Sequence, residues 1–489
     1  MYACTSLSEE TLVRRVASCI CHQPEIQALS RRWSGELTRR GFVAGVAASF
    51  AALGLPSRAS AQPAQATPAR PVVLANLRIF DGRSATLRDG LQVRIEGSRI
   101  QAVAPAAAAA PEGAMLIDCG GRVLMPGLID AHWHSFFAGL SLQRLLAGDV
   151  GYIHLAAAAE SRRTLMRGFT TVRDLGGPVF AFKQAVDEGL VDGPRIYPCG
   201  AMITGTGGHG DLRQLSDLPR QPGGELSFVE RSGAASIVDS PDEIRLRVRE
   251  QLMQGATQIK LVGGGGVSSP RSPLDLTTLT EAEVRAAVEI ARDWNTYVTV
   301  HAYAPATVQR AVASGARCVE HAHLMDETTA KMMADKGVWL SIQPFLSEED
   351  TGVLTGPSRV AALQVFAGTD NAYRLARKYK LKTAFGSDML FSPALAMRQG
   401  TMLNHLSRWY SNAEILTMAT STNAELLAMS GPRNPYPGKL GVIEDGAFAD
   451  LLLVDGNPLE NLALLATPET SLSLIMKDGR IHKNMISKT

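Results

Sequence analysis

Eight short apolar runs that alternate with helical stretches predict an α/β fold: a (β/α)8 TIM barrel with a small β-sandwich domain built from both ends of the chain. Three observations support this prediction: the alternation, the polar residues that end the apolar runs, and hairpin-rich segments near each end. A doubly wound open sheet would show the same alternation, so the positions of the polar residues decide between the two folds.

The apolar runs have the length and composition of buried parallel strands. They are residues 123–134, 170–175, 195–200, 258–263, 297–303, 318–323, 339–344 and 382–388. The stretches between them have helical periodicity, and Thr280 begins a Thr-x-x-Glu capping box ahead of one such stretch. Strand and helix alternating eight times favours a closed barrel.

Two β-rich segments flank this alternation. Their β-branched runs are broken by turn dipeptides, among them Asp445-Gly446 and Asp478-Gly479, which are typical of hairpins. Because the ends of a domain often lie close together, residues 71–123 and 435–489 are expected to pair into one composite β domain. Residues 124–434 are then the barrel.

Residues 1–61 are predicted to be an N-terminal extension followed by an export signal. Arg39 and Arg40 precede an apolar run that ends at Leu55, and an Ala-Ser-Ala cleavage pattern follows. The paired arginines resemble a twin-arginine signal, so we expect a periplasmic or secreted protein. The alternative is an anchor helix, but the run is shorter than the roughly 20 residues that span a bilayer. Residues 62–70, rich in Pro and Ala, are predicted to be a linker.

The charge pattern bears on the kind of partner. The formal net charge is +2, and no dense Lys/Arg run occurs in the body of the chain. Nucleic acid and anionic membranes are therefore poor candidates, and no stable membrane anchor is expected. A small-molecule substrate is the expected partner.

Metal-capable side chains lie at or near the carboxyl ends of five of the eight runs. They are His132, His134, Lys260, His301, His321 and Asp388. These ends meet at one mouth of a barrel, and residues two apart in a strand, such as His132 and His134, share a face. Taken singly, each has an ordinary explanation: a hydrogen-bonded histidine, a barrel-mouth or Schiff-base lysine, an N-capping aspartate. Together they predict a metal site.

The residue types indicate which metal. Imidazole and carboxylate ligands suit Zn²⁺. An ammonium group at Lys260 would be repelled by two dications, whereas a carbamate formed with CO2 would be an anionic bridge between them. We therefore expect two divalent metal ions, Zn²⁺ in the first instance, and a carboxylated Lys260. Asp388 is expected to bind one metal and to accept a proton from the attacking water.

With these residues in place, the chain resembles the amidohydrolase superfamily over about residues 71–489. The stretches that carry the resemblance are "PGLIDAHWH" (126–134) and "GVIEDGAFADLLLVDGNP" (441–458). The resemblance implies one metal held by two histidines and the aspartate, a second metal held by the other two histidines, and a bridging lysine. In this sequence these are His132, His134 and Asp388, then His301 and His321, then Lys260.

Further motifs narrow the resemblance. "TTVRDLGG", "TGGHGD", "IKLVGGGGVSSP", "VTVHAYAP" and "VEHAHLMD" are similar to the imidazolonepropionase-like Xaa-Pro and Xaa-Arg dipeptidase group, which includes bacterial ochratoxin-degrading amidohydrolases. Membership implies that Tyr303 polarises the scissile carbonyl, as a phenol suits a developing oxyanion. It also implies a homo-oligomer. The alternative for Tyr303 is a half-buried barrel tyrosine.

Four other residues are candidate substrate contacts. His209 lies on a glycine-rich loop at the predicted mouth, although its glycines also serve a tight turn. His323, two residues beyond a predicted ligand, is expected to support the site. Ala306 stands at a position where some relatives have a basic residue, so the group that binds the substrate carboxylate must be sought elsewhere. Arg271 and Arg310 are the nearest basic candidates for it.

The predicted function is hydrolysis of the amide bond to a C-terminal amino acid, in dipeptides or N-acyl amino acids. The apolar residues Met389, Leu390 and Phe391 favour a bulky hydrophobic substrate, with ochratoxin A-type N-acyl-phenylalanine amides as one example. One alternative is that the same site opens a cyclic amide or lactone. Another is a non-catalytic scaffold relative, which the complete set of six ligands disfavours.

Overall fold

The structure, a computed structural model, describes residues 70–220, 224–269 and 271–486. The predicted export signal, and all of the predicted linker except Arg70, lie outside these residues. Within the described ranges, no helix combines the length and the apolar character needed to cross a membrane.

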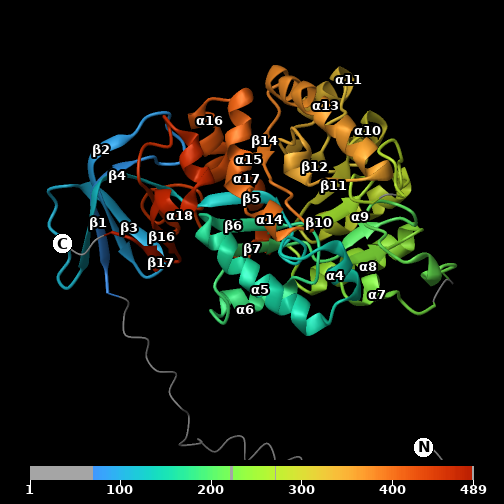
Figure 1. The fold of residues 1–489 in the computed structure, drawn as a ribbon, viewed down its shortest axis with the longest axis horizontal. Coiled ribbons are helices and arrows are strands. Elements are labelled where there is room, and N and C mark those ends of the chain that lie inside the picture. The colour runs from blue at the N-terminus through green and yellow to red at the C-terminus, as the bar shows by residue number, and fades with distance from the viewer. Residues whose placement is uncertain (1–69, 221–223, 270, 487–489) are drawn as a thin grey trace, which may run out of the picture. The chain divides into compact units, whose positions relative to one another are not determined.

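Each of the eight predicted runs contains a strand of a parallel barrel (Figure 1). The strands are β5 (Leu128–Trp133), β6 (Phe169–Asp174), β7 (Arg195–Pro198), β10 (Ile259–Val262), β11 (Val298–Ala302), β12 (Cys318–His321), β13 (Trp339–Ile342) and β14 (Thr383–Phe385). Helices follow them in turn: α5 (Val150–Met166), α6 (Phe180–Asp187), α8 (Pro241–Met253), α9 (Glu281–Asp293), α10 (Pro305–Ala313), α11 (Glu327–Asp335), α13 (Gly356–Lys378) and α15 (Gln399–His405). The predicted α/β barrel fold is confirmed.

The eight strands form two ladders, β5 to β7 and β10 to β14, which meet at two seams. At one seam the Thr257 amide donates to the Pro198 carbonyl over 2.8 Å, and at the other the Asp388 amide donates to the His132 carbonyl over 2.9 Å. The Asn423 side chain also donates to the carbonyls of Ile129 and Phe385, on the two strands of the second seam. The second seam therefore joins the two strands that carry His132 and Asp388.

Local sequence explains where α9 begins. The Thr280 hydroxyl accepts from the Glu283 amide, and the Glu283 carboxylate accepts in return from the Thr280 amide over 2.7 Å. This is the predicted capping box, which satisfies two backbone donors that a helix start leaves unpaired.

Two short strands were not predicted. β8 (Met202–Thr204) and β9 (Ala235–Ile237) extend the second ladder beyond β10, within the connection between β7 and α8. Strands of three residues are too short to show an alternating pattern, so tertiary pairing defines them. The loop that carries His209 lies between these two strands.

Strands from both ends of the chain form one seven-stranded sheet, in the order β17-β16-β15-β4-β1-β2-β3 (Figure 1). Their bounds are β1 (Val72–Ile79), β2 (Arg88–Glu96), β3 (Arg99–Pro105), β4 (Met115–Pro126), β15 (Leu451–Val454), β16 (Leu472–Lys477) and β17 (Arg480–Asn484). Asp478 and Gly479 make the β16–β17 hairpin turn with φ of 54° and 69°. Around Asp445-Gly446, where strands were predicted, the chain forms only isolated bridges.

The sheet leads directly into the barrel through β4 and β5, which only Gly127 separates. A Cβ atom at Gly127 would lie 2.0 Å from the Thr170 hydroxyl oxygen, so the close approach of β6 requires glycine here. This junction sets the register of the strand that ends in His132, Trp133 and His134.

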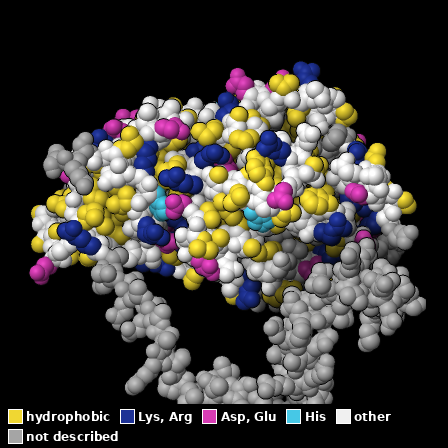
Figure 2. Space-filling view, turned by 60° about the horizontal axis from the view of Figure 1, so that its bottom comes forward, with side chains coloured by type: hydrophobic (Ala, Val, Ile, Leu, Met, Phe, Trp, Pro, Cys, Tyr) yellow, Lys and Arg dark blue, Asp and Glu magenta, His cyan; other side chains and the backbone are white. Residues whose placement is uncertain are grey.

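Figure 2 shows how charged side chains are distributed on one face of the molecule. In Figure 2, Lys and Arg side chains are scattered among Asp, Glu and hydrophobic side chains on the face shown. Charged side chains of both signs are therefore interspersed on this face.

Candidate metal centre

The predicted site residues converge on a cavity of about 480 Å³ at the carboxyl ends of the barrel strands. The predicted residues that line it are His132, His134, His209, Lys260, His301, Tyr303, His321 and Asp388. They come from the carboxyl-terminal parts of β5, β10, β11 and β12 or directly after them, from the loop between β8 and β9, and from the segment after β14, which are far apart in sequence. The barrel topology therefore brings together all six predicted ligands.

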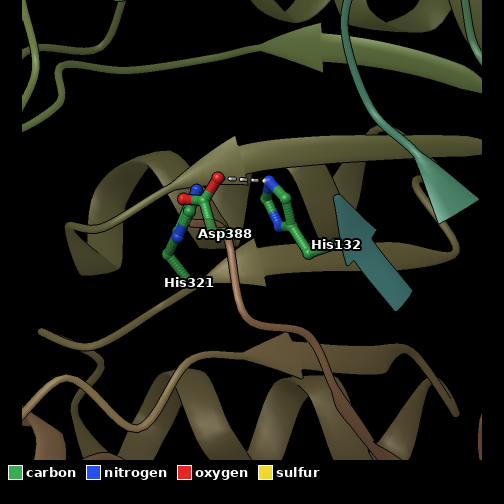
Figure 3. A group of neighbouring side chains, drawn as sticks. All are labelled: His132, His321 and Asp388. Atoms are coloured by element: carbon green, nitrogen blue, oxygen red, sulfur yellow. Dashed lines mark ion pairs between the residues drawn. The ribbon is translucent and has the colours of Figure 1, made fainter. Parts of the chain in front are cut away.

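Asp388 is the centre of this group. Its Oδ1 lies 3.3 Å from Nε2 of His132 and 3.3 Å from Nε2 of His134. Ligand atoms of His132, His321 and Asp388 lie within 4.8 Å of one another (Figure 3). Asp388 Oδ1 is buried and has no hydrogen-bond donor among the described residues. A buried carboxylate oxygen that faces imidazole nitrogens without a donor is what a cation site requires.

The four histidines each have one ring nitrogen paired with an oxygen acceptor, which favours the proton on that nitrogen. The pairs are His132 Nδ1 with Glu320 Oε2 (2.8 Å), His134 Nδ1 with Gly176 O (3.3 Å), His301 Nε2 with Gly265 O (2.9 Å), and His321 Nδ1 with Gln343 Oε1 (2.7 Å). The opposite nitrogen of each ring is then an unprotonated lone-pair donor. The donor set fits divalent metal ions such as Zn²⁺.

Burial supports the same protonation states. It lowers the pKa of His132 to about 4 and holds the pKa values of His301 and His321 well below the ordinary value. For Asp388, burial alone would raise the pKa, but His132 and His134 outweigh it and lower the pKa. Neutral imidazoles and an ionised carboxylate are the ligand forms that bind metal.

Lys260 lies inside the group, with its Nζ 3.5 Å from Nε2 of His132. Its side chain is 1% exposed, and burial lowers the pKa of its ammonium group. A lowered pKa favours the neutral amine, which is the nucleophilic form of lysine. This environment is consistent with the predicted reaction with CO2.

The backbone places Asp388 with little freedom. Asp388 has a φ of 50°, in the left-handed region, and its amide bonds to the His132 carbonyl. Two residues before it, a Cβ atom on Gly386 would lie 2.4 Å from the His132 Cβ atom. The glycine of "GSD" thus lets β14 approach β5 closely enough for Asp388 to face His132.

Sequence reasoning missed a buried ion pair behind His132. Glu320 Oε1 accepts from Nη2 of Arg173 over 2.6 Å, and both side chains are 0% exposed. Burial alone would raise the pKa of Glu320, but Arg173 first and then His132 hold it well below its ordinary value. Glu320 is therefore ionised where it faces Nδ1 of His132. The sequence did contain a signal for this pair: Arg173 and Glu320 each lie within an apolar run. Because a buried charge needs a partner, two opposite charges in such runs indicate an ion pair.

Gln343, at the end of β13, was also missed. Its side-chain oxygen pairs with His321, its amide nitrogen lies 3.2 Å from Nδ1 of His132, and its carbonyl pairs with His323 Nε2 at 2.8 Å. Gln343 therefore pairs with His321 and His323 and lies against His132. Its place at the end of the seventh apolar run was the signal that would have found it.

Replacing Glu320 by Gln is expected to weaken metal binding by about 10- to 100-fold, because His132 loses the charged acceptor that orients its ring. Competition with a fluorescent chelator measures the affinity. Glu289→Gln, at an exposed position on α9, is the matched control. Equal affinity in both variants would show that the Glu320 charge does not act on the metal centre.

Tyr303, His209 and His323 surround the ligands. The Tyr303 ring stacks on His321 with centroids 4.7 Å apart, and burial and Asp388 raise the pKa of its phenol well above the ordinary value, so it stays protonated. The His209 ring stacks on His301 at 4.4 Å. His323 is buried behind Tyr303 and does not line the cavity. His323 therefore supports the residues of the site from behind and does not contact a substrate in this cavity.

The two basic candidates lie apart from the main cavity. Arg310, on α10, donates to the Leu279 carbonyl, and Arg271 donates to the Arg213 carbonyl. Neither is among the residues that line the cavity of the metal centre, whereas Arg271 lines a second, adjoining cavity.

The remaining wall of the main cavity is mostly apolar. Its apolar side chains include Phe137, Met202, Leu212, Val267, Phe345, Leu354, Val365, Phe366, Leu390, Phe391 and Leu395. They come from β8, from the loops that follow the barrel strands, from α13 and from α14 (Pro393–Ala396). The predicted metal ligands thus form one wall of the cavity, and the apolar side chains named above form the rest, which we call the apolar chamber.

Known proteins share this sequence pattern and architecture. The profile of the amidohydrolase family matches residues 123–487. Ochratoxinase from Aspergillus niger is 28% identical over 392 residues, which cover 74% of this chain and 76% of the ochratoxinase. The crystal structure of an amidohydrolase is 35% identical, with a TM-score of 0.78, and covers 85% of this chain and 100% of its own.

The crystal structure of a prolidase complexed with N-methylphosphonate-L-proline is 34% identical, with a TM-score of 0.77, and again covers 85% of this chain and 100% of its own. These findings confirm the resemblance inferred from the sequence motifs. Divalent metal ions are the usual cofactors of the family. The chain belongs to the amidohydrolase family and is an enzyme that hydrolyses amide bonds.

Proposed function

We propose that the enzyme releases an amino acid from dipeptides or N-acyl amino acids whose acyl part is bulky and hydrophobic. The observation that carries the proposal is the apolar chamber directly above the convergent ligand set. The prolidase and ochratoxinase relatives support it, because both names describe hydrolases. N-acyl-phenylalanine amides of the ochratoxin A type fall within the proposed class.

We propose two divalent metal ions, Zn²⁺ in the first instance, as the cofactors. His132, His134 and Asp388 would hold one ion, His301 and His321 the other, and carboxylated Lys260 would lie between them. Bound there, the ions would supply Lewis acidity and ionise a water at neutral pH.

The chain's own groups then have distinct tasks. Asp388 accepts a proton at its carboxylate and passes it to the leaving amine, because its lowered pKa keeps it ionised beforehand. The protonated phenol of Tyr303 donates to the oxyanion that develops on the carbonyl. His209, neutral because burial lowers its pKa to about 4, lies beside His301 where it can contact the leaving group.

The test is a screen of N-acyl amino acids, dipeptides, lactams and lactones after reconstitution with Zn²⁺ and bicarbonate. The expected result is release of free amino acid from N-acyl amino acids with large apolar acyl groups. Turnover confined to lactams or lactones would replace the proposal with ring opening by the same groups. Export by the twin-arginine route and assembly into a homo-oligomer stay predictions.

Phe366, on the α13 wall of the chamber, offers a finer test. Phe366→Ala is expected to lower kcat/KM for a large aromatic acyl group about tenfold, because an apolar contact area in the bound state is lost. The same variant should change kcat/KM little for an N-acetyl substrate. Leu363→Ala, exposed on the same helix, is the matched control. An equal decrease in kcat/KM for both substrates would show that Phe366 stabilises the fold and does not recognise the acyl group.

A further inference from the structure

The leaving amino acid of the proposed reaction carries a carboxylate that needs a partner. Among the described residues that line the main cavity, Lys260 is the only lysine or arginine, and it lies within the ligand set. The acidic residues of that lining are Asp350 and Asp388, which offer no positive charge to a substrate carboxylate. The cation for a substrate carboxylate must therefore come from outside this lining.

A second cavity of about 220 Å³ adjoins the main one. Leu212, Ser268 and Ser269 line both cavities, so the two cavities adjoin at these residues. The loop between β8 and β9 presents His209 to the main cavity and Arg213 to the second. The same loop therefore borders both cavities.

Arg213 is built into this second cavity with a free donor. It is 4% exposed, and its Nε and Nη2 donate to the two Asp211 carboxylate oxygens over 2.7 and 2.6 Å. Its Nη1 is buried and has no acceptor among the described residues. Nη2 also donates to the Thr206 hydroxyl over 3.2 Å, so Nη1 is the free donor. A buried guanidinium held in this way can bind a second carboxylate through Nη1 at low cost in side-chain entropy.

Two further features of the lining point to the same ligand chemistry. Arg271 also lines the cavity, so the charged residues of its described lining are two arginines and Asp211. The described remainder is largely apolar and includes Leu142, Leu146, Leu215 and Leu218. This combination suits a carboxylate attached to an apolar group.

We propose that the second cavity is a carboxylate-binding subsite for the leaving amino acid, with Arg213 and Arg271 as its cations. The proposal rests on the proposed function and names the carboxylate anchor of that same site. The carboxylate has two chemical sources, the α-carboxylate or an acidic side chain, and substrate pairs distinguish them.

The experiment uses the Zn²⁺-reconstituted full chain and four probes. N-benzoyl-L-phenylalanine and its amide differ in the α-carboxylate, and N-benzoyl-L-glutamate and N-benzoyl-L-glutamine differ in the side-chain carboxylate. Arg213→Gln and Arg271→Gln are compared with Arg317→Gln, an exposed arginine before β12. Loss of a charge-assisted hydrogen bond should raise KM about 10- to 100-fold for the carboxylate that uses the subsite.

The expected pattern is a raised KM with little change in kcat, confined to one member of a substrate pair. Raised KM for N-benzoyl-L-phenylalanine but not its amide assigns the α-carboxylate, and the same contrast within the glutamate pair assigns the side chain. Equal effects on both members of each pair, or no effect of Arg271→Gln, would overturn the subsite. Arg271→Gln keeps the test decisive if Arg213→Gln fails to fold, because the Arg271 side chain is exposed.

Direct binding separates this proposal from the proposed function. If no probe is hydrolysed, isothermal titration of N-benzoyl-L-phenylalanine and N-benzoyl-L-glutamate still tests the subsite. Binding that Arg271→Gln weakens about tenfold or more would support the subsite although the proposed function fails. Binding of equal strength in every variant, or none in the unaltered protein, would exclude it.

Discussion

Asp388→Asn is expected to lower kcat by about 100- to 10,000-fold, the range by which a positioned proton acceptor accelerates a reaction. Asparagine keeps the size of the side chain and one oxygen toward His132 and His134, but it cannot hold a transferred proton. The backbone contact from the Asp388 amide to the His132 carbonyl is unaffected by the change. We therefore expect the variant to fold and to retain metal.

Two measurements separate chemistry from metal loss. Metal content after gel filtration should match that of the unaltered enzyme, while release of the amino acid falls. Asp335→Asn, at an exposed position on α11, is the control for loss of a surface carboxylate. Full activity of Asp388→Asn would remove Asp388 from proton transfer, and a metal-free variant would restrict its role to that of a ligand.

The arrangement of Asp388 illustrates what the sequence could predict. His132, Lys260, His301, His321 and Asp388 each lie at or near the carboxyl end of an apolar run, and a barrel brings such ends to one mouth. This inference needs only the period of the pattern and the position of the polar residue. Because the inference does not depend on the details of packing, it predicted both the barrel fold and the cluster of metal-capable residues.

The partners of those residues could not be predicted in the same way. Glu320 and Arg173 are 147 positions apart, and their pairing depends on how side chains of β6 and β12 meet across the barrel interior. The carbonyl groups of Gly176 and Gly265 that pair with His134 and His301 carry no residue-type signal at all. Only the three-dimensional structure shows which backbone oxygen faces which imidazole ring.

The loops between the strands are the least predictable part. Arg213 lies 13 residues after the last residue of the third apolar run, in a connection that also contains two unexpected three-residue strands. Its burial results from Asp211, which folds the loop back through contacts with the Gly207 amide and with Arg213 itself. Arg271 was expected at the site on proximity alone, and the structure places it in the adjoining second cavity.

Arg173→Met is expected to lower the free energy of unfolding by about 3–5 kcal/mol, because it leaves Glu320 buried without its counter-ion. Methionine has a similar length, so the change removes charge and hydrogen bonds more than volume. The bonds lost are those to the Ala131 carbonyl, the Tyr297 hydroxyl and Glu320. Urea denaturation, with and without a chelator, measures the change and separates it from loss of metal.

The double variant Arg173→Met/Glu320→Leu identifies the cause. If the cost lies in an unpaired buried charge, removing both charges should restore most of the stability, because apolar replacements of a buried pair are often neutral. Metal affinity should not recover, since His132 still lacks the acceptor at Nδ1. Arg285→Met, which breaks an exposed pair with Glu281 on α9, is the control and should leave stability nearly unchanged.

The two readouts together decide what the ion pair is for. If Arg173→Met is as stable as the unaltered protein, Glu320 is not charged in the folded state. Glu320 would then not fix the proton of His132 on Nδ1. Recovery of both stability and metal affinity in the double variant would make the pair purely structural. Recovery of stability alone would show that Arg173 keeps Glu320 ionised so that Glu320 can orient a metal ligand.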